Sequence, residues 1–111
     1  MKKAKQIIIL AALLLPTVVI AGEWTPPVDI KVSYVHLNHG GYGFYEISDT
    51  SRNPDNCNTS WYVVSKQNNP IFNEIYSLML ASHMSGKQVR LFIQGCSPHG
   101  HPEIMHVKTV K

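Results

Sequence analysis

The sequence lacks most of the features that normally reveal a reaction. It contains only two cysteines, Cys57 and Cys96, and they do not have the C-x-x-C spacing of a redox pair. No serine stands in a nucleophile elbow or beside a glycine-rich turn, and the chain has no internal repeat and no low-complexity segment. We therefore expect a protein that is not an enzyme and that needs no cofactor.

The chain also lacks an apolar run of full membrane-spanning length. Residues 7–20 are apolar, but a bilayer span needs about 20 such residues, and Pro16 interrupts the run. Lys2, Lys3 and Lys5 precede it, and Ala21 closes it with a small residue. This pattern predicts a cleaved signal peptide over residues 1–21, with a membrane anchor as the alternative. We expect one domain over residues 22–111, periplasmic or secreted, with no membrane span after cleavage.

The excess of positive charge in the sequence lies in the predicted signal peptide, residues 1–21. The chain has 10 Lys and Arg against 7 Asp and Glu, but three of the lysines lie in residues 1–21. The remaining part is balanced in charge. We therefore expect no nucleic-acid partner.

Residues 69–96 carry the clearest structural pattern. Asn69 suits the N-cap of a helix and Pro70 its first position. Apolar residues then recur at three- and four-residue spacing around most of the helix, and Gly86 predicts a left-handed cap that ends it. Val89, Leu91 and Ile93 alternate with Arg90, Phe92 and Gln94, which predicts a strand with one face in the core.

Four other stretches predict strands. They are residues 30–37, 42–47, 61–64 and 104–110, joined by a turn at 38–41 and by loops at 48–58 and 97–102, while residues 22–27 form an extended lead. The predicted element order is β-β-β-α-β-β. This order predicts a mainly β fold with one helix, a five-stranded OB-fold-like barrel. An open α+β sheet of the same order is the alternative.

The two cysteines predict one disulfide, because an exported chain meets an oxidising environment. A bridge between Cys57 and Cys96 closes a loop of about 40 residues and contributes roughly 4 kcal/mol of stability in the chain-entropy account. Metal ligation and a redox pair are the alternatives.

Several short segments resemble a group of small exported proteobacterial proteins of unknown function. The segments are 53–57 (NPDNC), Tyr62, 69–70 (NP), 76–78 (YSL), 85–87 (SGK) and 95–96 (GC). The resemblance covers residues 34–110. It implies the disulfide between Cys57 and Cys96, and it implies no activity.

Residues 23–25 (EWT) and 85–91 (SGKQVRL) are similar to segments of the B subunits of subtilase cytotoxin and of pertussis-like typhoid toxin. Those proteins are OB-fold pentamers that bind sialylated glycans, so the resemblance implies an OB-fold and suggests sugar binding. The chain departs from them in the position of its disulfide and in its shorter C-terminal part. Ile93 stands where the cytotoxin subunit has a tyrosine that touches the sugar, and no residue matches the serine that receives the sialic acid carboxylate.

Histidine is frequent in this chain, with six residues. Zinc and copper sites use clustered imidazoles, which makes His99, His101 and His106 weak candidates for metal ligands. No carboxylate or cysteine stands at ligand spacing beside them, and scattered histidines explain the count equally well. We expect no metal site.

Aromatic residues suggest a sugar site. Such sites use a ring face for the apolar side of a pyranose and nearby amides for its hydroxyls. Tyr42 and Tyr45 point to opposite faces of their strand by alternation, so at least one is expected at the surface, whereas Phe44 and Trp61 are expected in the core. The predicted glycan-binding residues are Tyr42, Tyr45 and Gln94.

These observations predict an exported, non-enzymatic binding module that binds a glycan, as the toxin B subunits do. A periplasmic structural or protein-interaction module without a sugar site is the alternative. The apolar circumference of the helix predicts a homo-oligomer, and the resemblance implies a pentameric ring. A monomer results instead if the 48–58 loop covers the second face of the helix.

Overall fold

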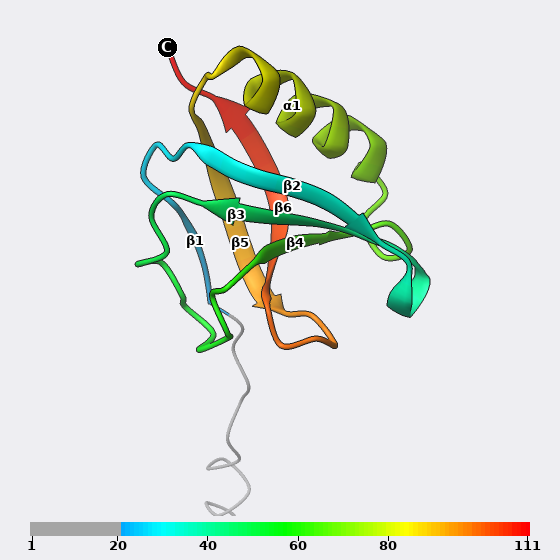
Figure 1. Ribbon diagram of the computed structural model, residues 1–111. Helices are drawn as coiled ribbons and strands as arrows, with labels where there is room; N and C mark the ends of the chain where they lie inside the picture. Colours follow the sequence, from blue (N-terminus) through cyan, green and yellow to red (C-terminus); the bar gives the residue numbers. More distant parts are fainter. Residues whose placement is uncertain (1–20) are drawn as a thin grey trace, which may run out of the picture.

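The computed structural model describes residues 21–111, so the predicted leader lies outside the described residues except for Ala21. The elements follow in the order β1 (Gly22–Trp24), β2 (Ile30–His36), η2 (Asn38–Gly40), β3 (Tyr42–Ile47), β4 (Tyr62–Ser65), α1 (Phe72–Ser85), β5 (Val89–Cys96) and β6 (Pro102–Thr109) (Figure 1). A mainly β fold with one helix is therefore confirmed. Within residues 21–111, no helix is long and apolar enough to span a membrane.

The strands form one six-stranded mixed sheet in the order β1-β5-β6-β4-β3-β2. All neighbours are antiparallel except β4 and β6, which run parallel where Val63 lies opposite Glu103. The predicted count of five strands in the order β-β-β-α-β-β is wrong, because the lead segment forms a sixth strand. Gly22 lies opposite Gln94 and Trp24 opposite Phe92. The two prolines come after Trp24, so they leave the backbone of residues 22–24 able to pair.

The two edges of the sheet approach each other through the segment that leads into β2. Val28 pairs with Val89 of β5 in an isolated bridge, and the backbone N–H of each donates to the carbonyl of the other, with N–O distances of 2.8 and 3.0 Å. The chain therefore passes from a contact with β5 directly into β2, at the far edge of the sheet.

The core lies between one face of the sheet and α1 (Figure 1). Its buried members are Val28, Ile30, Tyr45, Ile47, Tyr62, Val64, Ile75, Met79, Val89, Leu91, Ile93 and Ile104. A smaller cluster of Tyr42, Phe44 and Val63, with Trp61 packed against it, lies apart from this core. Alternation along β3 sends Tyr42 and Phe44 to one face and Tyr45 to the other, so both faces of β3 are covered.

The end of α1 agrees with the prediction, and its start does not. Gly86 has a left-handed backbone (φ 71°), and the N–H of Lys87 donates to the carbonyl of Ser82 at 2.9 Å, as in a Schellman cap. The helix begins two residues later than predicted, after Ile71. Asn69 forms a turn ahead of it, in which its side-chain oxygen accepts from the N–H of Ile71 at 3.0 Å. Its amide also donates to the carbonyl of Ile104, at 3.2 Å, which holds this turn against β6.

The predicted disulfide is present between Cys57 and Cys96. It ties the loop before β4 to the end of β5. The same loop is held by Asp55, which accepts from the backbone N–H of Gly95 at 2.7 Å, and by Arg52, which donates to the carbonyl of Trp24 at 3.4 Å. These contacts place the loop against β1 and β5, at a distance from α1 (Figure 1).

Candidate functional site

The three predicted glycan-binding residues do not lie in one site. Tyr42 and Tyr45 are each 1% exposed, and they belong to different clusters on opposite faces of β3. Gln94 lies on β5 opposite Gly22 of β1. Burial raises the pKa of the phenol in both tyrosines. Neither ring presents a face to solvent on which a sugar could stack.

Other aromatic residues form a partly exposed surface on the side of β3 that carries Phe44. Tyr34 of β2 is 40% exposed, and its ring centroid lies 5.0 Å from those of Phe44 and Trp61. The Phe44 ring is buried and supports the other two. We call the surface the aromatic–histidine face, defined by Tyr34, His36, His39, Phe44, Trp61, His99 and His101.

Four histidines from distant parts of the chain meet on this face. The His99 ring lies at the centre, with its centroid 4.5 Å from His39 and 5.5 Å from His36. The His101 ring is 6.4 Å away. Burial lowers the pKa of His99, and the three neighbouring imidazoles lower it further, because a second positive charge beside them is unfavourable.

Hydrogen bonds set the roles of two of these imidazoles. Nδ1 of His101 lies 2.8 Å from the carbonyl oxygen of Asn58, which can only accept, so Nδ1 donates and Nε2 is left as an acceptor when the ring is neutral. Nδ1 of His36 accepts from the backbone N–H of Asn38 at 3.2 Å, so its Nε2 carries the proton. The face thus offers a hydrogen-bond donor and an acceptor beside its rings.

The weak metal candidates are divided between two places. His99 and His101 lie on the aromatic–histidine face, whereas His106 lies beside Phe92 and Trp24, with ring centroids 5.2 and 6.3 Å from its own. Lys108 stands 4.4 Å above the Trp24 ring in the same patch. Among residues 21–111, no three histidine, cysteine or acidic side chains are arranged to hold a metal ion.

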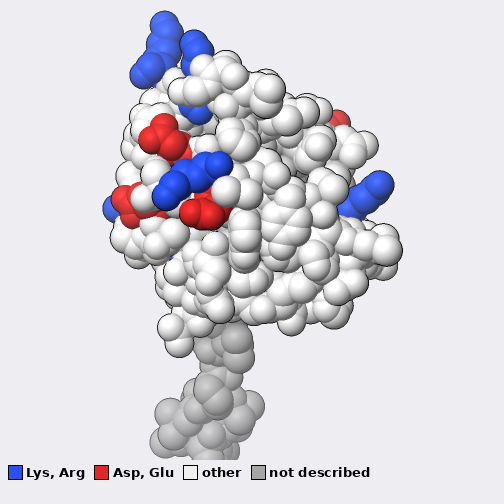
Figure 2. Space-filling model, viewed as in Figure 1, with Lys and Arg blue, Asp and Glu red and all other residues white. Residues whose placement is uncertain are grey.

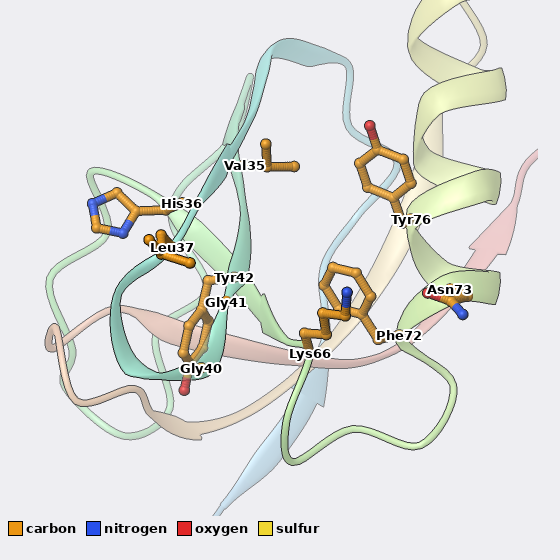
Figure 3. Close-up of a pocket in the computed structure, with 10 residues that line it drawn as sticks. All are labelled: Val35, His36, Leu37, Gly40, Gly41, Tyr42, Lys66, Phe72, Asn73 and Tyr76. Carbon is orange, nitrogen blue, oxygen red and sulfur yellow. The ribbon is translucent and has the colours of Figure 1, made fainter.

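A second hollow region lies between β2 and α1. A cavity of about 650 Å³ is lined by Val35, His36, Leu37, Gly40, Gly41, Tyr42, Lys66, Phe72, Asn73 and Tyr76 (Figure 3). A cavity of about 370 Å³ is lined by Ser33, Tyr34, Val35, Tyr45, Tyr76 and Leu80. Val35 and Tyr76 line both, so we treat the two cavities as one β2–α1 groove.

The prediction named Tyr42, which lines the groove, and His99 and His101 of the aromatic–histidine face, but it missed Tyr34 and His36 of β2. Val32, Tyr34 and His36 alternate along one face of β2, and they lie opposite Glu46, Phe44 and Tyr42 of β3. This alternation indicates which side chains share the face once the hairpin register is known. The arrival of His99 and His101 depends on the loop after β5, whose position no local pattern indicates.

Comparison with known proteins adds no family. Neither a family model, nor a curated protein, nor a solved structure matches this chain.

Proposed function

We propose that the chain is an exported, non-enzymatic binding module that holds a glycan on the aromatic–histidine face. The observation that supports this most is the pair Tyr34 and Trp61, whose rings meet nearly at right angles, at 80°, and remain partly exposed. A pyranose can stack on the exposed ring, while its hydroxyls bond to Nε2 of His36 and Nε2 of His101. Tyr34 and Trp61 thereby take the place of the buried Tyr42 and Tyr45.

An OB-fold-like barrel forms part of this proposal. The β2-β3-β4 meander, the helix before β5, the parallel contact of β4 with β6 and the Val28–Val89 bridge all suit a sheet that curls until its ends meet. In this barrel, β1 is an addition that pairs with the outer side of β5.

The disulfide supports a periplasmic or secreted location. A bond between Cys57 and Cys96 persists in an oxidising compartment and is rare in a reducing one. We propose that residues 1–21 direct export and are removed.

The test of glycan binding is an array experiment with oxidised protein comprising residues 22–111. We expect binding to a limited set of glycans, and we expect Tyr34→Ala to weaken it at least about fivefold, because loss of one stacking ring removes about 1 kcal/mol or more. Trp24→Ala is the matched control, since Trp24 lies in the separate patch with Phe92 and His106. An array without signal, or equal losses in both variants, would contradict the proposal.

A protein-interaction module is the second candidate, and the exposed edge of the sheet favours it. β2 has a neighbour on one side only, and it carries exposed apolar side chains toward both faces, including Tyr34 and Val35. An edge strand of this kind is suited to pairing with another chain. A homo-oligomer, such as the pentameric ring that the toxin-like resemblance implies, is one form of this candidate.

A further inference from the structure

We propose that the β2–α1 groove binds a small amphipathic carboxylate, with the apolar part of the ligand between Val35 and Tyr76 and its carboxylate at Lys66. This site is separate from the aromatic–histidine face, and it does not depend on glycan binding.

The groove has the lining that an apolar ligand needs. Phe72 and Tyr76 project from α1 toward the side of β2 that carries Val35, and Leu37 follows at one end (Figure 3). Val35 is 62% exposed and Leu37 is 87% exposed. The larger cavity alone, at about 650 Å³, is within the usual range of small-molecule sites, roughly 300–1,000 Å³.

Charge selects the kind of ligand. Lys66 is the only Lys, Arg, Asp or Glu among the residues that line the two cavities. Within residues 21–111 it has no ion pair, since the pair found there joins Lys31 to Glu46. The charged groups seen in Figure 2 gather mainly on the left of the view, and the centre of this face is largely uncharged. An anion entering the groove therefore meets one cation, Lys66, and no carboxylate among the lining residues.

The backbone holds the Lys66 side chain in position. The N–H of Lys66 donates to the carbonyl of Gly41 at 2.9 Å. A Cβ at Gly41 would lie 3.6 Å from Cβ and Cδ of Lys66, so the stem of the lysine runs along this glycine. At the other end, Ser33 and His83 join β2 to α1 through a 2.8 Å contact between Oγ and Nδ1. Lys66 therefore lies near one end of the groove, and the apolar lining extends from it toward Ser33.

The probe that tests this site is dodecanoate, measured by calorimetry below its micelle concentration with oxidised protein comprising residues 22–111. Dodecanol and dodecyltrimethylammonium are the matched ligands without the negative charge. We expect dodecanoate to bind more tightly than both. We expect Lys66→Gln to weaken the binding of dodecanoate at least about tenfold and to leave the affinity for dodecanol unchanged, because only the charged contact is lost.

Variants separate the site from general surface adsorption. Lys66→Arg is expected to retain binding, and Lys87→Gln, at an exposed lysine beyond the end of α1, is expected to have no effect. Tyr34→Ala on the aromatic–histidine face tests the proposal of glycan binding, whereas Lys66→Gln tests the proposal of carboxylate binding. Either proposal can therefore fail while the other stands. Absence of dodecanoate binding, equal binding of the cationic ligand, or equal losses in Lys66→Gln and Lys87→Gln would overturn the inference. A second copy of the chain seated in the groove would appear as absent binding together with a dimeric mass, and it would overturn the inference as well.

Discussion

Gly86 ends α1 by its backbone conformation alone. Its φ is 71°, and a Cβ built on it would meet no atom within 4 Å. Substitution therefore adds no clash, and its cost is the strain of a side chain in the left-handed region.

We expect Gly86→Val to lower the free energy of unfolding by more than roughly 1 kcal/mol, because β-branched residues tolerate positive φ poorly. For a domain of this size that is a fall in Tm of about 4–8 °C, measured by circular dichroism. Gly86→Asn is the control and is expected to lose less, since asparagine adopts this conformation more readily. An unchanged Tm in Gly86→Val would show that this backbone position carries no strain.

His99 makes the stability of the fold depend on pH. Its pKa in the folded protein lies below the ordinary value of 6.5, because of burial and of His39, His36 and His101 around it. As pH falls through 6.5, the unfolded chain gains the proton first, so the contribution of His99 is complete above that pH and is lost below it. Burial raises the pKa of Glu103, which gives the opposite slope in more acidic solution.

We therefore compare Tm between pH 7 and pH 5 in the native chain, in His99→Gln and in His106→Gln. The native chain and His106→Gln are expected to lose stability on acidification, and His99→Gln is expected to lose less. Equal losses in all three proteins would mean that the cluster around His99 does not govern the acid response.

At the scale of elements, the disulfide joins the loop before β4 to the end of β5. Cys57 and Cys96 are separated by 39 residues, and a loop of that length corresponds to roughly 4 kcal/mol in the chain-entropy account. Hydrogen bonds also hold this loop, among them those from the N–H of Gly95 to the Asp55 carboxylate and from the N–H of Asn58 to the carbonyl of Gly100.

We expect Cys57→Ser to lose a few kcal/mol of stability and to melt at the same temperature with and without reductant. The native chain is expected to melt at a clearly lower temperature when reduced. If thiol labelling of the native protein finds both cysteines free, the predicted bond does not form.

The elements that sequence could predict are those fixed by local chemistry. Gly86 correctly predicted the end of α1. The alternation of Val89, Leu91 and Ile93 correctly predicted β5, and these three side chains are buried. β1 could not be predicted, because Gly22–Trp24 is too short to show a period and is a strand only through its pairing with β5. The start of α1 was misplaced because Asn69 uses its side chain in a turn and in a bond to β6.

The candidate site was predictable only in part for a similar reason. Alternation correctly placed Tyr42 and Tyr45 on opposite faces of β3, but it does not reveal that both faces are covered. The main core covers Tyr45, and the loop that carries His99 lies against Tyr42, with ring centroids 4.9 Å apart. Contacts between segments so distant in the chain do not show in a local pattern.

At the scale of the whole molecule, exposed apolar side chains extend from β2 to the last turn of α1. Leu37 is 87% exposed and Met84 is 79% exposed, with Leu80 beside the groove between them. The 48–58 loop does not cover this surface, because its contacts run to β1 and β5. The cover on which the monomer alternative depends is therefore absent from residues 21–111. The other edge of the sheet, β1, receives the Arg52 contact on the carbonyl of Trp24, which leaves β2 as the more open edge.

We predict that the protein comprising residues 22–111 self-associates outside the groove, through the free edge of β2 and the exposed Met84 end of α1, because exposed apolar side chains mark interfaces and an unprotected edge strand favours pairing. Light scattering at micromolar concentration is expected to give a mass that is a multiple of a single chain. Met84→Lys is expected to shift that mass toward one chain. Ala81→Lys adds the same charge to an exposed position elsewhere on α1 and is expected to leave the mass unchanged. A single-chain mass for the native protein would remove the ring and, with it, the main support for a role like that of the toxin B subunits.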